Sequence, residues 1–99
     1  MVEDATKIAP HIYKVLFENE RVRVLEVTMQ PGDSSEMHSH PDYFFYLLGS
    51  GGKVRFTAPS GETGEAELPT GASMWREAEE HGAENIGGTV LRALFVELK

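Results

Sequence analysis

Apolar residues recur at every second position over short stretches of this chain, and clusters of Gly, Pro, Asn, Asp and Ser interrupt them about every ten residues. Such alternation is typical of strands with one buried face, and helical periodicity is hard to find. Strands are predicted at residues 11–17, 21–29, 36–40, 43–48, 53–57, 65–68 and 90–98. Seven or eight short strands with tight turns predict an all-β fold, built as a sandwich or a barrel.

Two segments depart from the alternation. Residues 43–48 are apolar on both faces, which predicts a central strand buried on each side. Residues 1–6 are polar and lack a strand pattern, so we expect them either to be loose or to reach across to a partner chain. The 99 residues are too few for a second hydrophobic core, which needs roughly 50 more. A single domain over residues 1–99 is therefore predicted.

Composition and charge exclude several classes of function. The chain has 16 acidic and 9 basic residues, a net charge of −7, and an acidic surface repels the phosphate backbone of nucleic acids. It has no cysteine, which excludes thiol catalysis, disulfides, Fe–S clusters and cysteine zinc sites. Its longest apolar run, residues 43–48, is far short of the ~20 residues that span a membrane, and no signal peptide is recognisable. A cytoplasmic protein that binds neither nucleic acid nor membrane is expected.

Three of the four histidines carry the chemical interest. His38 and His40 are two residues apart, so on a strand both imidazoles leave the same face and can share one metal ion. His81 lies about forty residues downstream, where a rolled β fold could place it opposite the pair. Neutral imidazole binds most late divalent ions. The alternatives are exposed loop histidines at 38 and 40 and a hydrogen-bonded structural histidine at 81.

The spacing of these residues resembles the two metal motifs of the cupin family. Gly32 is followed after five residues by His38-x-His40, and Gly71 precedes His81-x3-Asn85. The resemblance spans residues 15–98. It implies a small single-domain cupin, a jelly-roll β-barrel or double-stranded β-helix, with a divalent metal held inside by His38, His40 and His81. Because the ligand histidines accommodate Fe, Mn, Ni or Zn, the identity of the metal stays open.

The chain departs from both motifs. The glutamate ligand of the first motif should fall at Phe44 or Phe45, and neither side chain can bind a metal. The second motif has Glu77 and Glu79 in place of its proline and glycine. The metal shell could be completed by water or by one of the nearby oxygen donors, which are Glu36, Asp42, Tyr43, Glu79 and Glu80.

A substrate pocket beside the metal would be lined by residues of several segments. The candidates are Phe45, Phe56, Trp75, Asn85 and Arg92. The aromatic residues could instead fill the core or a subunit interface, and Asn85 is typical of a turn. An inward arginine would suit an anionic substrate, although a solvated outer face is the commoner place for one.

Two classes of function follow. The first is a metal-dependent enzyme, such as a dioxygenase or an isomerase, that acts on a small molecule, and its catalytic residues are not identified by the sequence. The second is a non-catalytic barrel that binds or senses a small molecule or a metal, or a degenerate cupin without metal. A homodimer that covers exposed edge strands is expected in either case.

Overall fold

The computed structural model describes residues 3–99, which form nine strands and one short helix. In chain order the elements are α1 (Ala5–Ile8), β1 (Tyr13–Glu18), β2 (Val22–Met29), β3 (Ser34–His40), β4 (Tyr43–Leu48), β5 (Gly52–Thr57), β6 (Thr63–Leu68), β7 (Ser73–Arg76), β8 (Glu79–Asn85) and β9 (Leu91–Leu98). The sequence pattern missed α1, β7 and β8. Strand β8 is hard to recognise because glutamate and glycine occupy many of its positions. No helix of residues 3–99 is long and apolar enough to cross a membrane.

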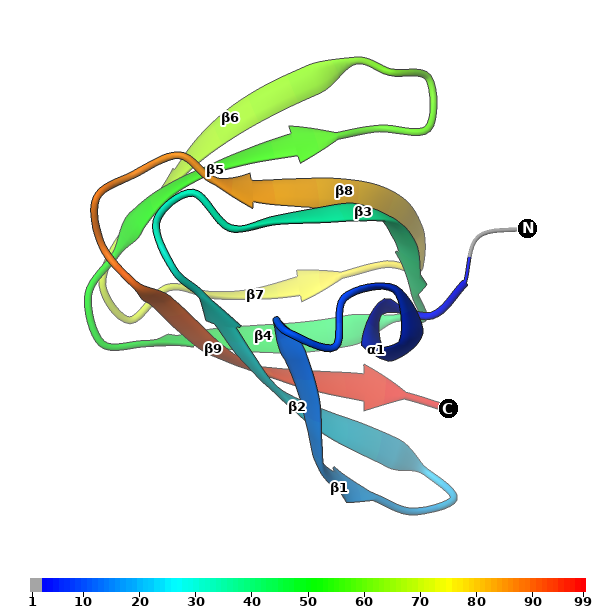
Figure 1. The fold of residues 1–99 in the computed structure, drawn as a ribbon. Helices are drawn as coiled ribbons and strands as arrows, with labels where there is room; N and C mark the ends of the chain where they lie inside the picture. The colour runs from blue at the N-terminus through cyan, green and yellow to red at the C-terminus, as the bar shows by residue number, and fades with distance from the viewer. Residues whose placement is uncertain (1–2) are drawn as a thin grey trace.

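The strands form two antiparallel sheets that face each other (Figure 1). One sheet has five strands in the order β1-β2-β9-β4-β7, and the other has four in the order β3-β8-β5-β6. The all-β prediction is therefore confirmed. The closed barrel is not, because β7 pairs only with β4 and β6 only with β5, and within residues 3–99 no ladder joins the two sheets.

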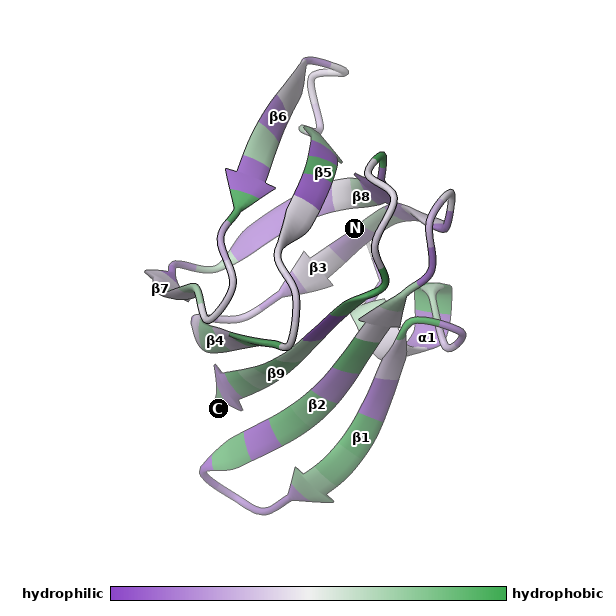
Figure 2. Cartoon of the chain, turned by 90° about the vertical axis from the view of Figure 1, so that its left-hand side faces the viewer, coloured by the Kyte–Doolittle hydropathy of each residue, from purple (hydrophilic) through white to green (hydrophobic). Residues whose placement is uncertain are grey.

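The inner faces of the two sheets enclose the hydrophobic core. Strand β2 shows the alternation plainly, because Leu25, Val27 and Met29 are buried while the residues between them are only partly covered. Hydrophobic positions are frequent along β1, β2 and β9, and β3 and β8 are more hydrophilic (Figure 2). The five-stranded sheet therefore supplies most of the apolar wall, and the four-stranded sheet supplies most of the polar side chains between the sheets.

Strand β4 differs from its prediction. It lies between β9 and β7 in its sheet, but the second sheet covers only one of its faces. Tyr43 and Leu47 are buried, whereas Phe44 and Tyr46 on the other face are 41% and 45% exposed. The expectation that residues 43–48 are buried on both faces is wrong, because the strand is central within its sheet but not between two covering layers.

The segment before β1 is packed against the sheets. The Asp4 side chain accepts a hydrogen bond from the backbone N–H of Thr6, which caps α1, and Ala5 is fully buried. The backbone at Asp4 pairs with Ser39 of β3. The expected loose tail over residues 1–6 is therefore corrected for residues 3–6, because these contacts fasten them. Residues 1 and 2 lie outside the described residues.

The glycines that open the two histidine motifs have a conformational role. Gly32, between β2 and β3, has φ +88°, and Gly71, between β6 and β7, has φ +76°. Residues other than glycine rarely adopt this left-handed backbone conformation. Gly32 therefore makes the turn into β3, and Gly71 makes the turn into β7. A Cβ atom added at either position would contact nothing within 4 Å, so neither glycine is needed to make room for the histidines.

Candidate metal centre

The structure brings the three histidines together on the inner face of the four-stranded sheet. His38 and His40 lie on β3, and His81 lies directly opposite His38 on the paired strand β8. All three are buried, with side-chain nitrogens that lie within 4.8 Å of one another. Within residues 3–99, these three histidines are the one group of three or more potential metal ligands whose donor atoms lie this close together.

Each of the two histidines on β3 has one ring nitrogen occupied. Nδ1 of His38 lies 2.8 Å from the carbonyl oxygen of Glu36, and Nδ1 of His40 lies 2.8 Å from Oε2 of Glu97. Both acceptors require a proton on Nδ1, so in the neutral tautomers both Nε2 atoms carry lone pairs. These two Nε2 atoms are 3.1 Å apart. Ligand nitrogens on one tetrahedral zinc ion are about 3.3 Å apart, so the pair fits a shared metal ion.

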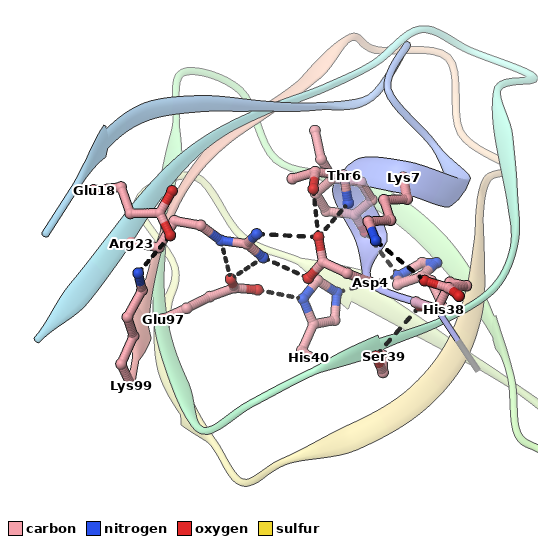
Figure 3. A network of polar contacts seen from close by, with 12 residues as sticks. Asp4, Thr6, Lys7, Glu18, Arg23, His38, Ser39, His40, Glu97 and Lys99 are labelled. Carbon is pink, nitrogen blue, oxygen red and sulfur yellow. Dashed lines mark hydrogen bonds and ion pairs between the residues drawn. The ribbon is translucent and has the colours of Figure 1, made fainter. Parts of the chain in front are cut away.

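Glu97 connects the cluster to a chain of charges (Figure 3). Its side chain is 1% exposed and accepts hydrogen bonds from His40 and from Arg23, whose Nε lies 2.8 Å from Oε1. The Arg23 guanidinium also binds Asp4, at 2.6 Å. The hydrogen bond to Asp4 raises the pKa of Arg23, burial lowers it and Glu97 raises it again, with a net rise. Such carboxylate–histidine pairs orient metal ligands and raise their basicity.

His81 has a carboxylate partner of its own. Oε1 of Glu79 lies 3.5 Å from Nδ1 of His81, and the same carboxylate binds Arg76 and the hydroxyl of Tyr43. Burial raises the pKa of Glu79, but the hydrogen bonds from His81, Arg76 and Tyr43 lower it, and the pKa ends well below its usual range. Glu79 is therefore anionic at neutral pH. Of the two acidic residues considered beside His81, Glu79 contacts it and Glu80 is exposed.

Burial shifts the pKa values of His38 and Tyr13 so that both side chains are uncharged at neutral pH. Burial lowers the pKa of His38 to about 4, the Glu36 carbonyl opposes this shift, and the neighbouring His40 and His81 lower it further. Burial also raises the pKa of Tyr13, whose hydroxyl lies 3.2 Å from Nε2 of His38, and Glu97 adds to this rise. At neutral pH His38 is thus the neutral imidazole that binds metals.

Two of the predicted oxygen donors lie outside the cluster. The Glu36 side chain is exposed and only its backbone carbonyl reaches His38, because the β3–β8 register shifts between Ser35 and His38 and breaks the alternation. Asp42 is exposed and accepts a hydrogen bond from the backbone of Ala78. Tyr43 is buried with its ring 4.9 Å from that of His40, and its hydroxyl donates to Glu79 at 2.6 Å.

A cavity of about 120 Å³ lies between the sheets beside His81. Two of the predicted pocket residues, Phe45 and Phe56, line it. The full lining is Tyr13, Val27, Met29, Tyr43, Phe45, Leu47, Val54, Phe56, Ala66, Leu68, Met74, Arg76, His81, Ala83, Leu91, Ala93 and Phe95. A more open hollow of about 310 Å³ shares Phe56, Arg76 and His81 with it, so the same residues border both spaces.

Three of the predicted pocket residues do not line the cavity. Trp75 is 49% exposed, on the outer face of the five-stranded sheet. Arg92 is also outward, where it approaches Glu26 at 3.9 Å. Asn85 is buried, but its amide donates to the carbonyls of Met29 and Thr89 and joins β8 to two neighbouring segments. Trp75 and Arg92 lie outside the cavity because their strand register turns them outward, and Asn85 does because its amide is bonded to backbone carbonyls.

Phe44 and Phe45 occupy the two positions at which the first motif would place its glutamate. Phe44 lies on the outer face, and Phe45 lines the cavity with its ring 5.7 Å from that of Phe95. Sequence reasoning missed Tyr13, Arg23 and Glu97 as neighbours of the histidines. Glu97 did carry a signal, because it has the same strand parity as Ala93 and Phe95 and is therefore an acidic residue on an inward face.

Comparison with known proteins gives the family. No protein-family model matches the chain, and no curated protein does. Among solved structures, a cupin domain from Bordetella pertussis Tohama I superposes with a TM-score of 0.78 at 31% identity, over 89% of this chain and 92% of that one. The chain belongs to the cupin superfamily.

Two other solved cupin-like structures share the fold at lower identity. The polyketide cyclase RemF from Streptomyces resistomycificus has a TM-score of 0.62 and 24% identity, over 87% of this chain and 63% of that one. Fe(II)-HppE with an alternative substrate has a TM-score of 0.63 and 21% identity, over 86% and 48%. At these identities the likeness extends to the fold alone.

Proposed function

We propose that this cupin binds one divalent metal ion through His38, His40 and His81 and uses it to bind and transform a small molecule in the adjacent cavity. The observation that carries the proposal is the approach of two Nε2 lone pairs, from His38 and His40, to 3.1 Å. The Tyr13 hydroxyl, 3.2 Å from Nε2 of His38, can donate to that lone pair but not to the one on His40. Two acceptors at 3.1 Å repel each other unless a proton or a cation lies between them. A cation satisfies both lone pairs, and it leaves both Nδ1 donors with the partners they have.

The donor set favours a late divalent ion with open coordination positions. Three imidazoles suit Fe, Mn, Ni or Zn, and three protein ligands are the usual number in catalytic sites. An ion held there would polarise an oxygen atom of the bound molecule. The residues of this chain position the ligands, since a backbone carbonyl, Glu97 and Glu79 each approach one histidine. They also exclude water, because all three imidazoles are buried.

The reaction is a narrower proposal. A polyketide cyclase and an Fe(II) enzyme share the fold, which shows that it supports metal-assisted and cyclising chemistry in other chains. For this chain we propose dioxygenase or isomerase chemistry as the two classes to test. A non-catalytic binding protein is the second candidate, and the observation that favours it is Phe45, which puts an apolar ring in the cavity wall.

Elemental analysis of untagged protein purified without chelator tests the metal site. We expect about one metal ion per chain in the wild type and none in a His38→Ala/His40→Ala double variant. His11→Ala is the matched control, because His11 is exposed and outside the cluster, and it should keep the metal. Circular dichroism checks that each variant is folded. A wild type that is empty and takes up no added Fe, Mn, Ni or Zn contradicts the proposal.

The metal-loaded protein then separates the two candidate functions. An enzyme consumes O2 or converts a substrate in a screen of small hydroxyl and carbonyl compounds, and the double variant loses this activity. A binding protein takes up such compounds without turnover. Both outcomes are compatible with metal binding at the three histidines. This experiment therefore decides between an enzyme and a binding protein, and elemental analysis tests the metal site.

A further inference from the structure

The wall of the cavity defines the kind of molecule that it accepts. Apart from one end, the lining consists of aliphatic and aromatic side chains from both sheets. The buried aliphatic part comprises Val27, Met29, Leu47, Val54, Ala83, Leu91 and Ala93. A charged group placed against this wall would lose its hydration and find no partner, which is costly. The body of the ligand must therefore be apolar.

Aromatic rings from both sheets contribute to the same wall. Phe95 stacks on Tyr43 with ring centroids 4.8 Å apart, and its ring also meets Tyr13 edge-on at 5.9 Å. Phe56 lies on the opposite sheet, 5.4 Å from the ring of His81. Flat rings pair with such walls in offset or edge-to-face arrangements. The arrangement favours a planar ring over a branched chain.

The size of the space limits the ligand to one ring. The cavity is about 120 Å³, and an engineered apolar cavity of ~150 Å³ is known to bind benzene. A fused bicyclic molecule would not fit without movement of the sheets. A single six-membered ring fills the space, and one or two further atoms would extend towards the open hollow that shares His81 with the cavity.

The polar groups at one end of the lining are already paired. Arg76 binds Glu79 at 2.6 Å, and the Tyr43 hydroxyl donates to the same carboxylate. The guanidinium charge is therefore balanced and does not select an anion. His81 lines both the cavity and the open hollow, so it marks the end at which an oxygen of the ligand would meet the proposed metal.

We propose that the cavity binds an uncharged, single-ring molecule with one oxygen substituent that points towards His81, a class that phenol and benzyl alcohol represent. This inference rests on the proposed function for the role of the oxygen, and on the cavity alone for the role of the ring. The two parts can therefore fail separately.

Titration of isotope-labelled full-length protein, followed by NMR chemical shifts, tests the ring. Toluene and phenol are added to metal-free protein, and both should bind saturably with a dissociation constant of order 1 mM. Ala66→Leu and Ala83→Leu fill the cavity from β6 and β8 and should each weaken binding at least about tenfold. Ala78→Leu is the matched control, because Ala78 is exposed and outside the lining, and it should bind as the wild type does.

Zinc-loaded protein tests whether the oxygen substituent of the ligand contacts the metal. Phenol should bind about tenfold tighter to the loaded protein than to the metal-free protein, and toluene should bind equally to both. Benzylammonium, which matches benzyl alcohol in size but carries a charge, should bind at least about tenfold more weakly than benzyl alcohol.

Three results would overturn the inference. They are no saturable binding of toluene or phenol to metal-free wild type, binding that survives in both filled variants while these remain folded, and equal binding of benzylammonium and benzyl alcohol. A protein that binds toluene but takes up no added Fe, Mn, Ni or Zn would instead contradict the proposed function and keep the apolar cavity.

Discussion

The two faces of the five-stranded sheet are built from the same strands, yet they differ in nearly every physical respect. On the inner face of β4, Tyr43 and Leu47 are buried beside the cavity, and Glu97 of the neighbouring β9 holds His40. On the outer face, Phe44 and Trp75 are exposed side by side on paired strands. Apolar residues occupy both faces, so hydrophobicity alone does not distinguish them. Their environments differ because the four-stranded sheet covers only one face.

Loss of the inner carboxylate should have the largest effect. Glu97→Ala leaves Arg23 and His40 without their buried partner, and we expect the free energy of unfolding to fall by ~3–5 kcal/mol. Urea denaturation of the metal-free protein measures it. The control, Glu26→Ala, removes an outer-face carboxylate that lies 3.9 Å from Arg92, and it should cost less than ~1 kcal/mol. Equal losses would mean that the inner network contributes no more than a surface pair.

Truncation of an inner aliphatic residue should come next. Leu47 is 2% exposed and lines the cavity, so Leu47→Ala should lower the free energy of unfolding by ~2–5 kcal/mol. Leu98→Ala on the outer face, where Leu98 is 42% exposed, should cost less than ~1 kcal/mol. Thermal unfolding followed by circular dichroism ranks the two variants. A reversed ranking would show that the outer face contains the tighter packing.

A gentler change at Glu97 should act on the metal site more than on the fold. Glu97→Gln keeps a side chain of the same size but weakens the orientation of His40, and we expect metal affinity to fall about 10–100-fold. Competition with a chromophoric chelator measures the affinity. Glu26→Gln serves as the outer-face control and should leave the affinity unchanged. An unaltered affinity in Glu97→Gln would rule out Glu97 as a positioning residue.

The outer face should respond through association instead of folding. We predict a homodimer in which a second copy covers this face at the edge strand β7, so light scattering should give twice the 11.0 kDa chain mass. Phe44→Ser/Trp75→Ser should return the mass to that of one chain with the fold intact. Leu16→Ser, on β1 at the opposite edge, is the control and should stay dimeric. A wild-type mass near 11.0 kDa at micromolar concentration would contradict the dimer.

The smallest effect should appear at the rim of the inner face, at Asp4. Burial raises the pKa of Asp4, but hydrogen bonds from Arg23 and Thr6 lower it to about 2, from 3.8. A carboxyl whose pKa is lower in the folded state stabilises the fold above its unfolded pKa. The stability advantage of wild type over Asp4→Asn should therefore be full above pH 3.8 and shrink as the pH falls towards 2.

Urea denaturation across this pH range measures the advantage. Glu20→Gln, in an exposed turn, is the control and should differ from wild type by less than ~0.5 kcal/mol throughout. An advantage of wild type over Asp4→Asn that does not change with pH would show that the Asp4–Arg23 contact is not maintained in solution.

The sequence by itself determined most of the strands and the three histidines. Period-two alternation reports which side chains share a face, and His38 and His40 are close in the chain, so local geometry alone places them together. The left-handed turns at Gly32 and Gly71 are likewise local. The family resemblance followed from these spacings, and the 31% identical cupin domain confirms it.

Only the tertiary structure decided what surrounds the histidines. Glu97 is 57 residues from His40 in the chain and Tyr13 is 25 from His38, so no local pattern links them. The structure also decided which phenylalanine of the pair at 44 and 45 enters the cavity, because strand parity separates neighbours but does not say which face is covered. The structure also excluded the Glu36 side chain as a metal ligand, because a register shift between Ser35 and His38 interrupts the alternation on which that prediction depended. Local spacing positions ligands along one strand, whereas their partners depend on which strands the two sheets bring together.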